Sequence, residues 1–351
     1  MAGTMAGTFS ERLTGILNGG ALTLMISVGH RTGLFEAMRG RSPATSREIS
    51  DRAGLSERYV REWLGAMVTG GVVDYDGSAG RYDLPADRAE LLTGLGTNLA
   101  IPAQYIPLLA AFEDQIVRCF RRGGGVPYGS YARLHEVMAE DTGQTLVATL
   151  ETTILPLVPD LLGKLQAGID VLDVGCGRGR ATNRMARLFP RSRFSGYDIS
   201  DAAIASARME ANRGGTRNLR FEVRDCAGIP DREAFDLVTA FDVLRDQSRP
   251  DAILAGARDA LRAGGTLLMQ DIRCSSHLHN NLGHPLAPLI YTISCMHCMS
   301  VSLAAGGAGL GAALGEEKAL EMLLAAGFRV EAVHHLPHDV LNTYYVARRS
   351  T

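Results

Sequence analysis

The sequence predicts an α/β protein, with a mostly parallel sheet in its C-terminal half and a mainly helical region before it. Three observations support this fold class. Short apolar runs alternate with helical segments after residue 170, the first of these runs leads into a glycine-rich turn, and the last two runs follow each other as a hairpin. The hydrophobic content of 46% and the charged content of 21% are typical of a folded globular chain.

The C-terminal half begins with V-L-D-V-G-C-G-R-G at residues 171–179, which predicts a buried strand that turns sharply into a helix. Glycines let backbone N–H groups approach a ligand closely. The dinucleotide-binding fingerprint is G-x-G-x-x-G. Here the third glycine comes one residue early, and Asp173 stands two residues before the first. The turn therefore indicates a cofactor but disfavours a nicotinamide or flavin dinucleotide.

Alternating strands and helices follow this turn in order. The predicted strands are 170–174, 193–197, 219–224, 235–240, 265–271, 328–335 and 343–348. The predicted helices are 181–188, 202–212, 252–261 and 316–326. This alternation specifies helices on both faces of the sheet and places ligands at the carboxyl ends of the strands.

Polar and aromatic residues end the predicted strands in an order that suits a bound cofactor. Asp198 follows Gly179 by 19 residues and ends the second strand, where a carboxylate accepts hydrogen bonds from both hydroxyls of a ribose. Asp225 ends the third strand, and Phe241 lies at the end of the fourth. The candidate cofactor-binding residues are Asp173, Gly175, Cys176, Gly177, Asp198, Ile199, Asp225, Cys226 and Phe241.

The N-terminal region predicts a winged helix. Apolar residues recur at helical spacing through 9–37, a short helix covers 46–53, and a further helix begins after Ser56. Two strands at 72–75 and 81–84, joined by a polar turn, complete the pattern as a hairpin.

A winged helix suggests DNA binding, but the charges argue against it. Four arginines and four acidic residues between positions 47 and 62 cancel, whereas contact with phosphates needs a surplus of positive charge. The net charge of -2 gives no general attraction to nucleic acid or to an anionic membrane. We therefore expect a small-molecule partner.

The cysteine content and the hydropathy of the sequence indicate where in the cell the protein is located. Six cysteines in a 351-residue chain without a recognisable signal peptide predict reduced thiols and a cytoplasmic location. The stretch 274–315 contains no Asp, Glu, Lys or Arg. Because prolines and hydroxyl-bearing residues interrupt its apolar run, we expect a buried helical segment rather than a membrane span.

The glycine turn with Asp173 before it, followed in order by Asp198 and Asp225, closely resembles the motifs of class I S-adenosylmethionine-dependent methyltransferases. The sequences Y-V-R-E-W-L at 59–64 and G-G-G-V-P-Y at 123–128 are similar to those of bacterial methyltransferases with a transcription-regulator-like N-terminal domain. The resemblance implies S-adenosyl-L-methionine as cofactor and a Rossmann-like, seven-stranded methyltransferase sheet that ends in an antiparallel hairpin. It also implies that Asp225 accepts a hydrogen bond from the adenine amino group.

The same resemblance implies a division of the chain into three parts. These are a winged-helix dimerisation domain at 1–90, a helical linker and gating loop at 91–150, and an S-adenosylmethionine-binding catalytic domain at 151–351. It implies a homodimer that forms through the N-terminal domain, which also covers the active site. The glycine-rich loop 121–131 is either a plain connection or a gate that closes on the cofactor or substrate.

The residue that would act as base differs from the family pattern. Plant-type enzymes of this architecture use a histidine after the fourth strand, in a His-Asp pair, whereas V-L-R-D-Q at 243–247 has the permanently protonated Arg245 there. Either the acceptor arrives ionised or unprotonated, or another residue takes its proton. Candidates for catalysis are His277 and His279 after the fifth strand, which alternate so that one faces the cleft. The candidate substrate-binding and gating residues are Tyr128, Tyr131, Arg245 and Asn281.

A zinc site is a weaker alternative. Cys295 and Cys298 form a C-x-x-C motif, and Cys274 and three histidines precede it. No second C-x-x-C accompanies the motif, and cysteine in an apolar run usually belongs to a core. We therefore expect no metal.

The sequence as a whole predicts an S-adenosylmethionine-dependent methyltransferase. We expect in-line transfer of the methyl group to an O, N, C or S atom of an apolar small molecule. Two alternatives stay open. One is a cofactor-binding transcriptional regulator that uses its winged helix on DNA, and the other is a methyltransferase fold that no longer catalyses.

Overall fold

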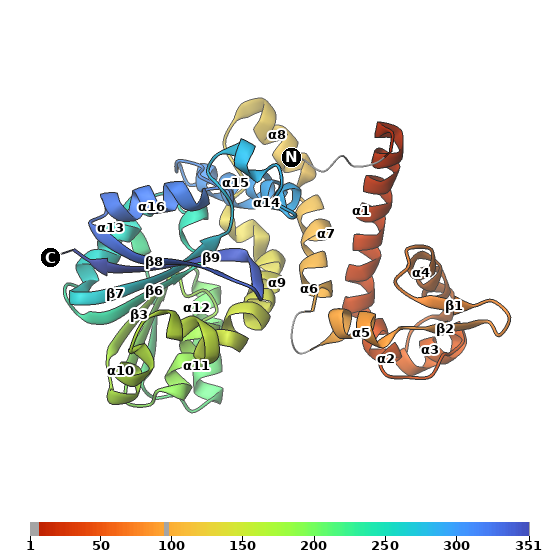
Figure 1. The fold of residues 1–351 in the computed structure, drawn as a ribbon, viewed down its shortest axis with the longest axis horizontal. Helices are drawn as coiled ribbons and strands as arrows, with labels where there is room; N and C mark the ends of the chain where they lie inside the picture. The colour runs from red at the N-terminus through yellow and green to blue at the C-terminus, as the bar shows by residue number, and fades with distance from the viewer. Residues whose placement is uncertain (1–6, 95–97, 351) are drawn as a thin grey trace. The chain divides into compact units, whose positions relative to one another are not determined.

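The structure is a computed structural model that describes residues 7–94 and 98–350. These residues form two compact units, which we describe separately (Figure 1). The sheet unit contains residues 112–132 and the chain from 145 onward. The helical unit contains the described residues up to 111 together with 133–144.

A seven-stranded sheet organises the sheet unit, with the strand order β5-β4-β3-β6-β7-β9-β8. Its strands are β3 (Asp170–Val174), β4 (Arg193–Asp198), β5 (Leu219–Val223), β6 (Phe235–Phe241), β7 (Leu261–Ile272), β8 (Phe328–Leu336) and β9 (Asp339–Arg349). Strands β3 to β7 pair in parallel, and β9 runs antiparallel to both β7 and β8. The predicted fold class is confirmed, including the final antiparallel hairpin.

Helices cover both faces of this sheet, as Figure 1 shows. They are α10 (Leu161–Ala167), α11 (Arg180–Leu188), α12 (Asp201–Arg213), α13 (Pro250–Ala260) and α16 (Gly315–Ala325). Successive side chains of a strand point to opposite faces. Leu172 and Val174 therefore enter one core with α13 and α16, whereas Val171 enters a second core with α10 and α11. Burial on both sides explains why these strands read as continuous apolar runs.

Several shorter elements complete the sheet unit. They are α8 (Glu113–Arg122), η1 (Tyr128–Tyr131), η3 (Leu150–Ile154), η4 (Leu155–Leu157), η5 (Cys226–Gly228), η6 (Leu244–Asp246), η7 (Leu278–Asn281), α14 (Ala287–Ile293), η8 (Ser294–Cys298) and α15 (Met299–Ala304). The segment 142–165 is not one regular α-helix, because π-helical turns at 143–147 and 150–154 interrupt it.

The uncharged stretch is helical, as predicted, but it is only partly buried. Phe9–Thr32 and Ala287–Ala304 are each long and apolar enough to cross a membrane, a test that core helices of globular proteins also pass. Only 39% of Ala287–Ala304 is buried. Its buried residues include three of the serines that interrupt the apolar run, and the Ser302 hydroxyl donates to the carbonyl of Gln247 at 2.8 Å.

The helical unit contains the predicted winged helix. Its elements are α1 (Phe9–Thr32), α2 (Leu34–Met38), α3 (Ser46–Ala53), α4 (Glu57–Thr69), β1 (Asp74–Asp76), β2 (Arg81–Asp83), α5 (Ala86–Thr93), α6 (Ala100–Ala103), α7 (Tyr105–Ala110), α9 (Ala132–Thr142) and η2 (Gly143–Val147). Trp63 lies at the centre of its core, where its indole N–H donates to the carbonyl of Met25 at 2.9 Å and its ring meets Phe35 edge-on.

Candidate active site

The glycine turn lies at the carboxyl edge of the sheet, between β3 and α11. Val174 pairs with Tyr197 of β4 and with Ala240 of β6, so the ends of all three strands meet at this edge. Gly175 and Gly177 have φ of 64° and 53°, a conformation that favours glycine. A Cβ atom at Gly175 would lie 2.6 Å from the side chain of Val243, whereas one at Gly177 would meet nothing within 4 Å. Gly177 therefore leaves space at the point where a ligand can approach.

Asp198 joins the end of β4 to this turn, which is the juxtaposition that the sequence predicts. One of its carboxylate oxygens accepts from the N–H of Gly177 at 2.8 Å, and the other accepts from the N–H of Ser200 at 2.8 Å. The side chain is buried, and this burial raises its pKa. Each carboxylate oxygen retains a second lone pair, so hydroxyl donors of a ligand fit here.

Asp173 supports the turn from within the protein rather than facing a ligand. Its carboxylate accepts from the hydroxyl of Thr182 at 2.6 Å and from that of Thr239 at 2.7 Å. Burial raises the pKa of Asp173 to about 6. The residue thus fixes β3 to α11 and β6.

The other predicted cofactor-binding residues differ in their surroundings. Burial raises the pKa of the Cys176 thiol well above its ordinary value and that of Cys226 to about 12, so both thiols stay protonated. Phe241 is half-buried at the end of β6, and Ile199 is exposed. Protonated thiols and these apolar side chains form weakly polar surface at the sheet edge.

Asp225 is exposed and already has partners. One oxygen accepts from the N–H of Ala227 at 2.8 Å, and the other lies 3.2 Å from the guanidinium of Arg249. An adenine amino group that binds Asp225 must therefore share the carboxylate with Arg249.

The two tyrosines of the glycine-rich loop have different roles. Tyr131 is buried, its hydroxyl donates to the carbonyl of Met296 at 2.6 Å, and its ring packs between Phe112 and His297. Tyr128 is half-buried, and the pKa of its phenol is raised by burial and then by the carboxylates of Asp198 and Asp246. Tyr131 therefore anchors the loop, and Tyr128 lies within electrostatic range of Asp198.

Arg245 is buried in an ion-pair cluster. Its Nη1 lies 2.5 Å from a carboxylate oxygen of Asp242 and 3.1 Å from one of Asp271. Asp242 also accepts from the side-chain amide of Gln270 at 3.1 Å and has a φ of 60°, which is unusual for a residue with a side chain. Because two carboxylates keep it protonated, Arg245 cannot act as a base.

Asp246 was not among the predicted site residues. It ends η6 beside Arg245, is half-buried, and accepts from the side-chain amide of Gln247 at 2.9 Å. Burial raises its pKa to about 6, although the neighbouring Arg245 acts in the opposite direction. Its position in the sequence could have identified it, because it follows Arg245 directly where the related enzymes have a His-Asp pair.

The expected alternation of His277 and His279 is wrong. Residues 278–281 form the 3₁₀ turn η7, not an extended segment. Both histidines are exposed, and their rings stack with centroids 5.7 Å apart. His277 is the extended residue before η7 and His279 lies within the turn, so the strand-like alternation on which the expectation depended is absent.

Asn281 holds the loop that contains these histidines. Its side-chain oxygen accepts from the N–H of Ser275 at 2.8 Å. Its amide donates to the carbonyl of Ser275 at 2.8 Å and to the hydroxyl of Tyr291 at 3.0 Å. The residue is buried and closes the loop on itself.

The zinc alternative has no ligand set within residues 7–94 and 98–350, where no group of three or more His, Cys, Asp or Glu side chains is suitably placed. Cys298 is buried in the π-helical turn η8, with its sulfur 3.6 Å from Nδ1 of His297. Burial raises the pKa of this thiol to about 12.

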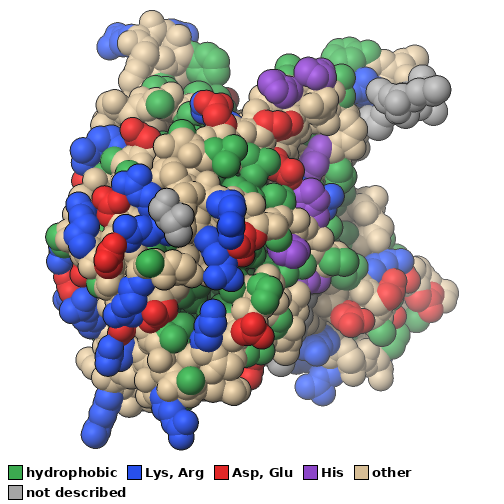
Figure 2. All heavy atoms as spheres, turned by 60° about the vertical axis from the view of Figure 1, so that its left-hand side comes forward, with side chains coloured by type: hydrophobic (Ala, Val, Ile, Leu, Met, Phe, Trp, Pro, Cys, Tyr) green, Lys and Arg blue, Asp and Glu red, His purple; other side chains and the backbone are tan. Residues whose placement is uncertain are grey.

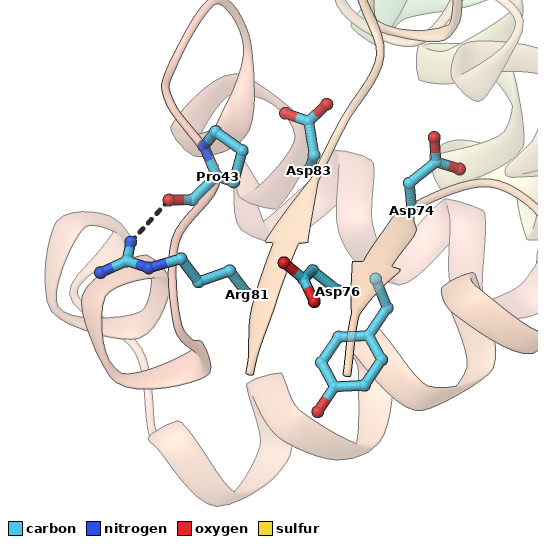
Figure 3. A pocket seen from close by; sticks show the side chains of 6 residues that line it. Pro43, Asp74, Asp76, Arg81 and Asp83 are labelled. Carbon is cyan, nitrogen blue, oxygen red and sulfur yellow. Dashed lines mark hydrogen bonds between the residues drawn. The ribbon is translucent and has the colours of Figure 1, made fainter. Parts of the chain in front are cut away.

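The winged helix presents little unpaired positive charge. On α4, Arg58 pairs with Glu62, and Arg61 pairs with Glu57 at 2.6 Å. The hairpin is acidic: Asp74, Asp76 and Asp83 line a pocket with Arg81, whose guanidinium donates to the carbonyl of Pro43 (Figure 3). Figure 2 looks mainly onto the sheet unit, where Lys and Arg are likewise interspersed with Asp and Glu.

Two family models match the chain. Residues 20–94 match the Rv2258c-like winged HTH domain, and residues 165–323 match a methyltransferase domain. The N,N-dimethyltransferase OxyT of Streptomyces rimosus is 25% identical over 249 residues, which cover 68% of this chain and 72% of that protein. A mitochondrial ubiquinone biosynthesis O-methyltransferase of Candida albicans is 32% identical over 108 residues, and there the match spans 30% of this chain and only 33% of the enzyme.

Solved structures share the fold over nearly the whole chain. The mitomycin 7-O-methyltransferase MmcR has a TM-score of 0.71 at 19% identity, with 97% of each chain covered. Human N-acetylserotonin methyltransferase in complex with SAM has a TM-score of 0.69 at 15% identity, with 99% of each chain covered. Two domain models match the chain, and Asp198 closes the glycine turn at the sheet edge. The chain therefore belongs to the S-adenosylmethionine-dependent methyltransferases that carry an N-terminal winged helix-turn-helix domain.

Proposed function

We propose that this protein transfers the methyl group of S-adenosyl-L-methionine to an apolar small molecule by in-line displacement. The observation that carries the proposal is the contact between the Asp198 carboxylate and the N–H of Gly177, at the sheet edge where the glycine turn leaves open space. When bound, the cofactor supplies an electrophilic methyl group on its sulfonium. The rest of the chemistry depends on how the protein's own residues bind, orient and desolvate the two reactants.

The residues present suit this cofactor. Asp198 offers free lone pairs to ribose hydroxyls, and Gly177 allows the backbone to approach the ligand without a side chain in the way. Asp225 would receive the adenine amino group in competition with Arg249. Phe241 and the protonated thiols of Cys176 and Cys226 would line the space, excluding water without adding charge.

The atom that accepts the methyl group is not fixed by the family. The relatives named above include both O-methyltransferases and an N,N-dimethyltransferase. The proposed function therefore covers transfer to an O, N, C or S atom of an apolar molecule. Neither a DNA-binding role nor a metal is part of it.

A calorimetric titration with S-adenosylhomocysteine tests the cofactor assignment. We expect the wild type to bind and Asp198→Ala to bind at least tenfold more weakly, a difference of about 1.4 kcal/mol. Asp251→Ala, which removes an exposed acid from the first turn of α13, should bind as the wild type does. Absence of binding by the folded wild type would overturn the proposal.

We further propose a cytoplasmic homodimer that forms through the N-terminal domain, residues 1–90. Helix α1 exposes Phe9, Ile16 and Leu17, which are 72%, 63% and 68% accessible and lie on one helical face. A second copy of this face would bury them. Light scattering after gel filtration should give a dimer mass for the wild type and for Asn18→Glu on the opposite face of α1. It should give a monomer for Ile16→Glu combined with Leu17→Glu, and a wild-type monomer would contradict the proposal.

A further inference from the structure

The carboxyl ends of β6 and β7 carry more acid than base. Arg245 is shared by Asp242 and Asp271, and Asp246 adds a third carboxylate on the adjoining turn η6. When these four side chains are ionised, three negative charges meet one positive charge. Such a site repels an anionic ligand and favours a cationic one.

Two side-chain acceptors at the end of β7 are buried and lack a hydrogen-bond partner among the described residues. Within the described part of the chain, the side-chain oxygen Oε1 of Gln270 and Oδ2 of Asp271 are buried without a hydrogen-bond partner. Both residues are at least nine-tenths buried. Both atoms are acceptors, so a ligand group that binds them must donate hydrogen bonds. The hydroxyls of Thr343 and Tyr345, on the neighbouring strand β9, are buried without a partner in residues 7–94 and 98–350 as well.

Two carboxylates of this group are accessible, because Asp242 and Asp246 are half-buried whereas Asp271 is buried. Asp242 already accepts from both Arg245 and Gln270. One oxygen of Asp246 accepts from the amide of Gln247. The carboxylates of Asp198 and Asp246 both raise the pKa of the Tyr128 phenol, so both lie within electrostatic range of it.

We propose that the methyl acceptor is an amine, and that Asp246 binds its ammonium group and takes one proton from it to free the nitrogen lone pair. This inference rests on the proposed function, because the methyl group comes from the sulfonium of the cofactor. It names a residue and an acceptor class that the cofactor assignment leaves open.

The atoms and charges of this step balance. The ammonium gives one proton to the Asp246 carboxylate, and the freed lone pair forms the new N–CH₃ bond. The S–CH₃ bond breaks, and its electron pair stays on sulfur as neutral S-adenosylhomocysteine. The positive charge moves from sulfur to nitrogen, where the carboxylates at this edge stabilise it as it develops. Asp246 then returns its proton to solvent when the methylated amine leaves.

An oxygen acceptor would suit this site less well. An ammonium that gives its proton to Asp246 becomes a neutral amine, whereas a hydroxyl that does so becomes an anionic alkoxide or phenolate. That anion would lie near the carboxylates of Asp242 and Asp271, which raises its energy.

Three probes that share one apolar body test the acceptor class. They are 2-(1-naphthyl)ethylamine, 2-(1-naphthyl)ethanol and 1-naphthylacetate, each titrated calorimetrically at pH 7.5 into the protein saturated with S-adenosylhomocysteine. We expect the amine to bind at least tenfold more tightly than the alcohol and the carboxylate. Asp246→Asn should weaken amine binding at least tenfold and leave the alcohol unchanged, whereas Asp246→Glu and the control Asp251→Asn should keep most of the preference.

Three results would overturn the inference. They are equal or tighter binding of the alcohol or carboxylate, no measurable binding of the amine, and an amine preference that survives in Asp246→Asn. Binding of S-adenosylhomocysteine is measured first on each variant. Its loss from the folded wild type would count against the proposed function, whereas normal cofactor binding without an amine preference would count against the amine acceptor alone.

Discussion

The two sides of the candidate site are built in different ways. At the ends of β3 and β4, the glycine turn and Asp198 are joined by a backbone hydrogen bond, so the cofactor side depends on main-chain conformation. At the ends of β6 and β7, Arg245 and the surrounding acids are joined by side-chain ion pairs, so the acceptor side depends on charge. The comparison teaches that a substitution can disable one side and leave the other intact.

The largest effect should come from removing the buried guanidinium. Arg245→Met would leave Asp242 and Asp271 close together without their counter-ion, and breaking a buried pair in this way costs about 3–5 kcal/mol. We expect that loss in the free energy of unfolding, measured with urea at pH 7. Arg249→Met removes an exposed ion pair and should cost less than about 1 kcal/mol. Equal losses for the two variants would contradict the description of Arg245 as the buried centre of its cluster.

The glycine turn offers a matched pair on the cofactor side. Gly179 has a φ of 68°, and a Cβ atom there would lie 2.5 Å from the ring of Phe221. Backbone strain and overpacking together should cost Gly179→Ala about 3 kcal/mol of unfolding free energy. Gly177→Ala meets no clash and should cost only about 1–2 kcal/mol, but its methyl group should weaken binding of S-adenosylhomocysteine. A Gly177→Ala variant that binds normally would show that the cofactor does not approach this residue.

The buried acid Asp173 should give stability a pH dependence. Its pKa in the folded protein is raised from 3.8 to about 6, so between these values the folded state holds a proton that the unfolded state has lost. Stability from this group therefore falls as pH rises from 4 to 6, by at most about 3 kcal/mol at 1.36 kcal/mol per pKa unit. We expect the free energy of unfolding of Asp173→Asn, measured with urea, to rise relative to that of the wild type between pH 4 and pH 7. A constant difference would contradict the raised pKa.

The smallest effect concerns the loop after β7. Asn281→Ala removes three hydrogen bonds that close the loop, and we expect a loss of about 1–3 kcal/mol in unfolding free energy. His279→Ala, on the exposed side of the same loop, should change it by less than about 0.5 kcal/mol. Neither variant should alter the affinity for S-adenosylhomocysteine, because the cofactor side is held by β3 and β4. A weakened affinity in Asn281→Ala would show that the two sides are coupled.

The cofactor side could be predicted from the sequence because its parts are local. A strand, a glycine turn and an acid at the end of the next strand each have a short signature, and parallel pairing brings them together. The acceptor side could not be predicted in the same way. The burial of Arg245 depends on Asp271, 26 residues away on β7, and the exposure of His277 and His279 depends on a turn that periodicity did not reveal. Asp246 was missed because its significance comes from burial, not from a motif.

The most direct test compares both sides in one titration. S-adenosylhomocysteine is titrated into wild type, Asp198→Ala and Asp246→Asn under identical conditions. We predict at least tenfold weaker binding, about 1.4 kcal/mol, for Asp198→Ala and less than a twofold change for Asp246→Asn. Unchanged binding by Asp198→Ala, or an equal loss in both variants, would contradict a cofactor side built on β3 and β4 and an acceptor side built on β6 and β7.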